Sequence, residues 1–229
     1  MSHSNDDIDK LISDPLLASH QAHDELSEFI LARVPPFQCP DPKKWPEEAQ
    51  SLRQRLLAEV ILKGIPDDWS IGQPDVVWGD TIETDEGYRI RKLRYEALPG
   101  LWIPSLLYEP TEMAAAVPAV LNLNGHVGPP GKAIDYKQLR CINLAKRGIL
   151  AMNPEWLYFG ELRTDGYVHN QSGHIDLSGV AGVGVFYLAM QRGLDVLLDT
   201  TWRIRSVWRS RAFLVEVGRP SYSVHWITA

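Results

Sequence analysis

Two loops carry most of the residue types that could do chemistry in this 229-residue chain. The first, residues 124–132, has the sequence NGHVGPPGK and follows a short apolar run. A loop at the carboxyl end of a buried parallel strand can offer backbone N–H groups to an oxyanion, with His126 lining the site. The same turn-forming composition is also typical of a plain connection. It is not a phosphate loop, since neither GxxxxGK[ST] nor GxGxxG occurs.

The second segment, residues 155–176, gathers acidic side chains, histidines and aromatic residues. One interpretation is a metal or acid–base cluster, but HExxH and similar ligand spacings are missing, so we predict no metal site. The other interpretation is a long surface loop that its polar groups cap and brace. Residues 158–161 stand where the rim of an active site would be built, and the candidate rim residues are Glu155, Trp156 and Glu161. The other polar candidates are Asp165, His169, His174 and Asp176.

The elements that would position these loops form a parallel unit. Residues 117–123 and 149–153 are short, nearly continuous apolar runs, which is typical of strands buried on both faces. A helix over residues 136–147 joins them, so we expect a right-handed βαβ unit. A further helix is predicted over 179–198. A third parallel strand should follow that helix, and the pattern shows none.

Antiparallel strands are predicted upstream of this unit. Residues 75–83 and 88–97 are predicted to be extended, and the turn sequence TDEG at 84–87 separates them. Residues 101–108 form a third strand after Pro99 and Gly100. The short connections favour antiparallel pairing.

The first 65 residues are predicted to be helical. Apolar residues recur at steps of three and four over 7–33, which indicates one or two helices that end before Pro35 and Pro36. A second helical pattern covers residues 47–63, and Gly64 ends it. We interpret residues 1–65 as an outer helical cover.

Composition excludes several classes of protein. Hydrophobic residues make up 45% and charged residues 23% of the chain, as in ordinary globular proteins. The net charge of −6 argues against general nucleic-acid binding. Two cysteines without CxxC spacing indicate neither a disulfide framework nor a zinc knuckle. The first residues lack the pattern of a signal peptide and no run is long enough to span a membrane, so we expect a cytoplasmic protein.

Three segments together resemble a known family. PAVLNLNGHVGPPGK, RGILAMNPEWLYFGE and GVFYLAMQRGLDVLL are similar to acetyl-xylan-esterase-like carboxylesterases of the α/β-hydrolase superfamily. The resemblance covers roughly residues 45–199. It implies hydrolysis of a small ester or an acetylated carbohydrate through an acyl-serine, without metal or organic cofactor. It also implies that Asn124, Gly125 and His126 form the side of the oxyanion hole that supplies one N–H.

The sequence departs from that family after Asp199. The family continues with a strand and a GxSxGG nucleophile elbow, then a carboxylate and a histidine, and no GxSxG occurs here. His225 could act as a base, but it has no elbow serine to serve. We therefore identify no catalytic residue in these 229 residues and predict that they are inactive.

The composition also changes at this point. Residues 200–229 hold five arginines, one acid and three of the eight tryptophans, which leaves 18 basic and 28 acidic residues in 1–199. Back-translation from the third base of the Thr200 codon permits RVAVTG followed by GLSGGG, a strand and an elbow. We interpret 200–229 as an out-of-frame tail, and we expect the restored strand to pair beside residues 149–153. The alternative is a true basic tail that binds an anionic surface.

The prediction is thus an α/β fold: the first half of an α/β-hydrolase sheet preceded by a helical and antiparallel β portion. Its parts are a helical cover (1–65), a partial hydrolase domain (66–199) and the tail (200–229). The predicted function is serine ester hydrolysis by family. The alternative is a non-catalytic binding protein built on the half sheet and its basic tail. The sequence leaves the oligomeric state open.

Overall fold

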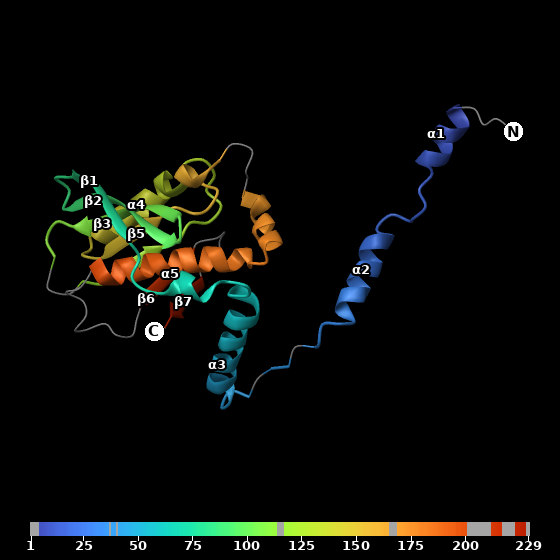
Figure 1. The fold of residues 1–229 in the computed structure, drawn as a ribbon, viewed down its shortest axis with the longest axis horizontal. Helices are drawn as coiled ribbons and strands as arrows, with labels where there is room; N and C mark the ends of the chain where they lie inside the picture. The colour runs from blue at the N-terminus through green and yellow to red at the C-terminus, as the bar shows by residue number, and fades with distance from the viewer. Residues whose placement is uncertain are drawn as a thin grey trace. The chain divides into compact units, whose positions relative to one another are not determined.

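A computed structural model of the chain describes residues 5–36, 38–39, 41–113, 117–164, 169–200, 212–216 and 223–227. The chain divides into two units, residues 1–51 and 52–229. The second unit contains a seven-stranded sheet with helices on both faces (Figure 1). The α/β class is therefore confirmed.

The first unit consists of helices. α1 (Asn5–Ser13) and α2 (Gln21–Leu31) match the predicted pair, and α3 (Trp45–Leu56) begins in this unit. None of the three helices contains a buried residue. Their apolar side chains are exposed, with Ile12 at 77% and Leu16, between α1 and α2, at 97%. That residues 1–65 cover the sheet stays a prediction.

The helix predicted over 47–63 is found in two parts. α3 passes directly into a single π-helical turn, η1 (Leu57–Ile61), and a short helix η2 (Asp67–Ser70) follows. Gly64 has a φ of +73°, and a Cβ there would overlap the carbonyl of Gly179. The Ala181 N–H donates to the Lys63 carbonyl at 2.9 Å. Only glycine permits this close approach, which joins the end of the helix to the segment before α5.

The antiparallel part is as predicted. β1 (Val76–Glu83), β2 (Tyr88–Leu98) and β3 (Leu101–Pro110) pair in sequence, with Tyr88 opposite Pro110. Gly87 and Gly100 lie in the two turns with φ of +85° and +82°, a conformation that side chains with a Cβ rarely adopt.

The parallel strands are β4 (Ala119–Asn122) and β5 (Leu150–Pro154), and every residue of β5 is buried. The order across the sheet is β1-β2-β3-β5-β4-β6-β7. β5 therefore has β3 and β4 as neighbours. This order corrects the expected position of a restored strand: a strand added after β5 cannot pair beside residues 149–153, because both edges of β5 are occupied, and it would pair on the far edge of β4.

The structure also contradicts the prediction that no parallel strand follows residue 199. β6 (Ala212–Glu216) pairs parallel with β4, and β7 (Ser223–Ile227) pairs antiparallel with β6. Both segments are rich in β-branched and aromatic residues, which favour extended structure. Pairing with β6 satisfies the backbone groups on the edge of β4 that faces away from β5.

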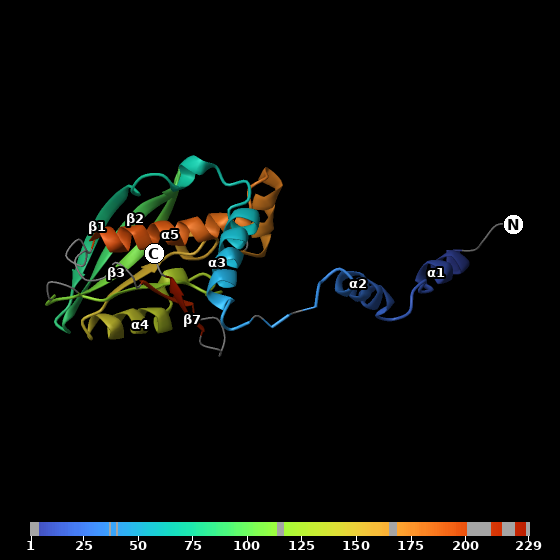
Figure 2. The same ribbon diagram turned by 90° about the horizontal axis from the view of Figure 1, so that it is seen from below.

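Helices α4 (Asp135–Ala145) and α5 (Gly182–Thr200) lie on opposite faces of the sheet (Figure 2). On the α5 face, Leu121 and Met152 pack with Leu188 and Leu197 of the helix in a large apolar core. On the α4 face, a smaller cluster contains Tyr88, Tyr108, Cys141, Ala145 and Ala151. Three short helices complete the unit: η3 (Gly131–Ala133), η4 (Gly160–Leu162) and η5 (His169–Ser178).

The connections that follow β4 and β5 lead to opposite faces of the sheet. The connection after β4 leads to α4 on one face, and the connection after the adjacent β5 leads to α5 on the other. In open α/β sheets such a point leaves a crevice outside the carboxyl ends of the strands, where ligands bind. Both loops singled out from the sequence begin at this point, at the carboxyl ends of β4 and β5.

Candidate functional site

The loop after β4 starts with the three residues proposed for the oxyanion hole. Asn124 is buried, and its Nδ2 donates to the Pro154 carbonyl at 2.6 Å, so its side chain braces the loop against β5. Gly125 is half-buried, and among the described residues its N–H forms no hydrogen bond. His126 is exposed. A backbone donor without a partner is what an oxyanion requires at this position.

The loop ends at Lys132, whose buried ammonium group contacts two carboxylates, the buried Glu155 and the exposed Glu161. Its Nζ lies 3.2 Å from Oε2 of Glu155 and also pairs with Glu161. Asn153 of β5 donates through Nδ2 to the Lys132 carbonyl at 2.8 Å. Charged groups this deep are stable only when they are paired and hydrogen-bonded. The end of the loop is therefore held at the carboxyl end of β5.

Glu155 is fully buried, although a rim residue would face solvent. Its Oε1 accepts the backbone N–H groups of Lys132 at 2.9 Å and Trp156 at 3.4 Å. Its Oε2 accepts the N–H of Glu161 at 3.3 Å. The carboxylate thus lies beneath the two loops and not on their rim. The exposed Glu161 and the half-buried Trp156 are closer to what a rim requires.

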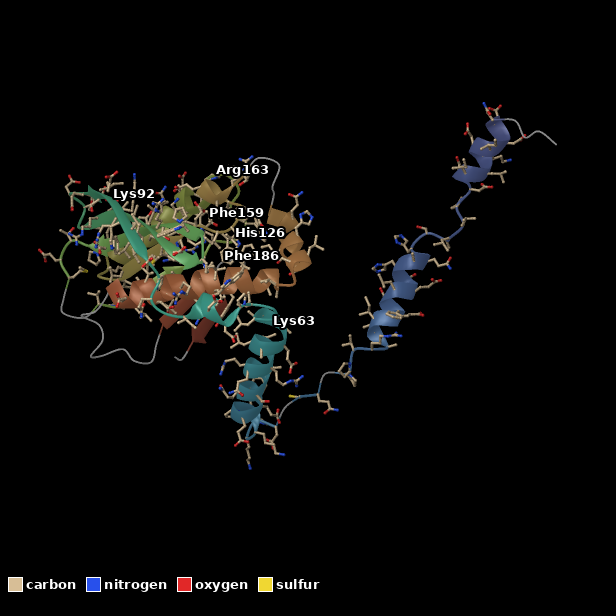
Figure 3. All side chains as sticks on the ribbon, viewed as in Figure 1. Lys63, Lys92, His126, Phe159, Arg163 and Phe186 are labelled. Atoms are coloured by element: carbon tan, nitrogen blue, oxygen red, sulfur yellow. The ribbon has the colours of Figure 1, made fainter. Side chains whose placement is uncertain are left out.

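The loop after β5 presents aromatic side chains. Trp156 packs on Phe186 of α5 with ring centroids 4.9 Å apart, and Tyr158 packs on the same ring at 6.4 Å. Phe159 meets His126 edge-on at 6.0 Å, which connects this loop to the loop after β4. Figure 3 shows His126, Phe159 and Phe186 at the same end of the sheet.

Tyr158 has a φ of +68° without being a glycine. Non-glycine residues in this conformation are uncommon, and they cluster at functional sites where the surrounding packing holds them. Its ring packs against the large core. The strained residue lies between the two aromatic residues Trp156 and Phe159, inside the predicted rim segment.

The remaining polar candidates do not join this cluster. Asp176 caps α5, because its Oδ1 accepts the Gly182 N–H at 2.6 Å. His174 is exposed in η5, and the backbone of His169 lies in the same short helix. Asp165 lies outside the described residues. Within the described ranges, no three His, Cys, Asp or Glu side chains are grouped as a metal site would require.

Polar side chains line the carboxyl ends of β4 and β5 on the α4 side. Both polar atoms of the fully buried Asn122, and Oδ1 of Asn124 and Asn153, have no hydrogen-bond partner among the described residues. Lys137 of α4, also fully buried, donates to the Leu123 carbonyl just before the loop. Buried polar atoms without a partner are uncommon. Several of them lie together here, which makes the carboxyl ends of β4 and β5 strongly polar.

Sequence reasoning missed the parts played by Lys132, Asn153 and Phe186. The local signal in the sequence was weak: Gly131 precedes Lys132 and Gly160 precedes Glu161, and glycine permits a close approach of the backbone. The spacing of 23 residues between Lys132 and Glu155 carries no local pattern. Their pairing follows only from the adjacency of β4 and β5.

No protein-family model and no curated protein sequence matches the chain. Among solved structures, the chain is similar to a Bacteroides fragilis protein assigned as an acetyl xylan esterase, with a TM-score of 0.66 and 20% identity over 88% of this chain. It is similar to a methylesterase with a TM-score of 0.54 and 21% identity over 78% of this chain. A glucuronoyl esterase from Solibacter usitatus matches with a TM-score of 0.50 and 14% identity over 82%.

The chain spans 55% of the first of these proteins, 37% of the second and 59% of the third. At these identities the likeness concerns the fold. It confirms a mixed α/β architecture that corresponds to part of an esterase-like, hydrolase-like sheet.

Proposed function

We propose that these residues are the amino-terminal part of a serine carboxylic-ester hydrolase, and that the loop after β4 supplies one side of its oxyanion hole. The observation that carries the proposal is the Gly125 N–H. It lies without a partner among the described residues at the carboxyl end of β4, where the connections after β4 and β5 lead to opposite faces of the sheet. A donor held there could stabilise the oxygen of a tetrahedral intermediate.

The braces around the loop support this role. An oxyanion donor is effective only if it is already in place when charge develops. Asn124 holds the beginning of the loop and Lys132 holds its end, in each case through contacts with residues 153–155. His126, exposed beside Gly125, lines the same site and is not itself required for the donor.

The three similar structures support the reaction class, since each is named as an esterase. Two of the three names refer to esters of carbohydrates, which favours an acetylated sugar or a similar small ester as the substrate. In such an enzyme a serine attacks the carbonyl, a histidine moves the proton and a carboxylate orients the histidine. None of these 229 residues is assigned to those roles, and the mechanism calls for no metal.

We further propose that the reading frame changes near codon 199, and that residues 200–229 replace the strand and elbow encoded in the other frame. The order of strands in the sheet is compatible with such a strand. β4 accepts a parallel partner on its far edge, where β6 lies, and a serine just after such a strand would face the loop 124–132.

The test begins with the nucleotide sequence around codons 195–230. We expect an intact downstream frame that encodes GLSGGG, an acid and a histidine. The 229-residue chain and the frame-restored chain are then treated with a fluorophosphonate probe and assayed on nitrophenyl, feruloyl and acetyl-sugar esters. Only the restored chain should be labelled and active, and changing its elbow serine to alanine should abolish both.

Each opposite outcome has a definite meaning. Stoichiometric labelling of a serine in the 229-residue chain would show that the nucleophile lies within it. Unrelated sequence downstream would contradict the frame change and favour a binding protein with a basic tail. A restored chain that folds but cleaves no ester would show that the assignment as an esterase is wrong.

A further inference from the structure

We propose that Glu155 is a positioning residue whose buried carboxylate fixes the loop 124–132 against the loop 155–161. The use of this fixation in catalysis rests on the proposed function. The fixation itself rests on the contacts of one side chain. Glu155 is fully buried and accepts hydrogen bonds from backbone groups of both loops.

Each oxygen of the carboxylate contacts both loops, since Oε1 also accepts the Trp156 N–H and Oε2 also pairs with the Lys132 ammonium. Oε1 receives the Lys132 N–H from the first loop, and Oε2 receives the Glu161 N–H from the second. The Lys132 ammonium balances the charge. Hydrogen bonds to an ionised acceptor are about twice as strong as neutral ones. A single carboxylate therefore joins the end of the loop 124–132 to both ends of the loop 155–161.

Two glycines make room for it. Gly131 has a φ of +54° and Gly160 a φ of +50°, and a Cβ on either would lie 2.7 Å or 2.5 Å from Cδ of Glu155. In both loops, the backbone of a glycine therefore packs directly against the carboxylate. A glutamate that only balanced the charge of Lys132 would need neither glycine, so the packing indicates that the carboxylate shapes both loops.

The chain contains a matched control in Glu109. This carboxylate is also buried, and it pairs with Arg89 at 2.8 Å and Arg91 at 3.3 Å. All three residues belong to the neighbouring strands β2 and β3. Glu109→Gln therefore removes a buried, paired carboxylate from the same sheet without touching either loop.

The first experiment compares Glu155→Gln and Glu109→Gln with the unchanged full-length chain by hydrogen exchange. A glutamine side chain has one acceptor oxygen and an NH2 group, so it would turn a donor toward the N–H of one loop. We expect amide exchange in peptides covering 124–133 and 155–162 to become at least tenfold faster in Glu155→Gln. Glu109→Gln should leave these peptides unchanged.

A spectroscopic readout follows the relative position of the loops. The ring of Phe159 lies edge-on to His126, so the His126 ring protons should show a ring-current shift. The signal is assigned by its loss in His126→Ala, since the chain has seven histidines. In Glu155→Gln the signal should move toward the value of an unstructured histidine at temperatures where the rest of the chain is folded. Glu109→Gln should not move it.

A second pair of variants keeps Glu155 in place. Gly131→Ala and Gly128→Ala both put a Cβ on a left-handed backbone, at φ of +54° and +68°, but only the first meets Glu155. Nothing lies within 4 Å of a Cβ on Gly128. We expect Gly131→Ala to speed exchange in residues 155–162, in the other loop, and Gly128→Ala to leave that loop unchanged.

Unchanged exchange and an unmoved His126 signal in Glu155→Gln would overturn the proposal, as would equal loosening in Glu109→Gln or Gly128→Ala. If Glu155→Gln does not fold, Gly131→Ala decides alone. None of these readouts requires turnover. A restored chain without esterase activity would therefore refute the proposed function, while the exchange data would still decide the role of Glu155.

Discussion

Tyr95 shows how tightly single side chains are fitted in this molecule. It is fully buried, and its hydroxyl donates to the Ala189 carbonyl of α5 at 2.8 Å. Burial raises the pKa of the Tyr95 hydroxyl well above its ordinary value. A Cβ on Gly193 would lie 2.5 Å from that hydroxyl oxygen. The contact between β2 and α5 therefore depends on a glycine as well as on the tyrosine.

We expect Tyr95→Phe to lower the free energy of unfolding by about 1 kcal/mol through loss of the hydrogen bond. Gly193→Ala should lower it by about 1–3 kcal/mol through overpacking, although alanine is the better helix former. In the variant that carries both substitutions, Gly193→Ala should lower the free energy of unfolding by less, because the Tyr95 hydroxyl oxygen that the new Cβ would meet is absent. Urea unfolding of the four chains measures this coupling. Strictly additive effects would show that the two residues do not compete for space.

Cys141 gives the stability of the chain a defined pH dependence. Burial raises the pKa of the Cys141 thiol to about 12, although nearby Lys137 and Arg140 act to lower it. In the unfolded chain the thiol ionises near pH 9. The unfolded state therefore gains stability as the pH rises above 9, and the folded chain loses stability until its own thiol ionises.

We expect the free energy of unfolding to fall between pH 9 and 12, with Cys141 contributing up to about 1.4 kcal/mol per pH unit. Cys141→Ala should remove that part of the slope, measured by urea unfolding at several pH values. Below pH 9 the variant and the unchanged chain should show parallel pH profiles. An identical slope above pH 9 in both chains would contradict the assignment to this thiol.

At the scale of elements, the burial of side chains varies strongly along α5. Leu188 is 1% exposed among residues of the sheet, whereas Leu198 is 40% exposed on the same helix. Val183, near the start of the same helix, is also exposed. The helix predicted over 179–198 is confirmed, but the face of the helix that the sheet covers changes along its length.

The two leucines therefore form a matched pair. Leu188→Ala should lower the free energy of unfolding by about 2–5 kcal/mol, because it removes buried methyl groups and leaves a cavity. Leu198→Ala should change it by no more than about 0.5 kcal/mol. Chemical denaturation of both variants measures the difference. Similar losses would mean that α5 packs in another register on the sheet.

At the scale of the whole molecule, the two units differ in how they bury residues. α1 and α2 contain no buried residue, while the sheet unit contains both apolar clusters. Within the described ranges, no helix combines the length and the apolar character needed to cross a lipid bilayer.

Removal of residues 1–36 should therefore leave the urea midpoint and melting temperature of the remaining chain unchanged. The removed helices bury nothing of their own, so the unfolding transition should report the sheet unit alone. Helical content measured by circular dichroism should fall. A lower midpoint in the shortened chain would show that α1 and α2 stabilise the sheet, as a helical cover would.

Local patterns were enough to predict most elements of the second unit. The strands near 101–108 and 149–153, the helices near 136–147 and 179–198, and the hairpin at 84–87 all lie within a few residues of their predicted places. Apolar periodicity, turn-forming residues and glycine stops act over a few residues, so they can be read along the chain. The location of the loop 124–132 at a carboxyl end follows from the same patterns.

The order of the strands and the surroundings of the site required the folded structure. The place of β5 between β3 and β4, and the pairing of β6 with β4, depend on partners far apart in the chain. The burial of Glu155 with Lys132 follows from that order, because adjacency of β4 and β5 brings residues 23 positions apart into contact. Local propensity carries no information about such pairings, since burial and charge pairing depend on what the rest of the fold places around each residue.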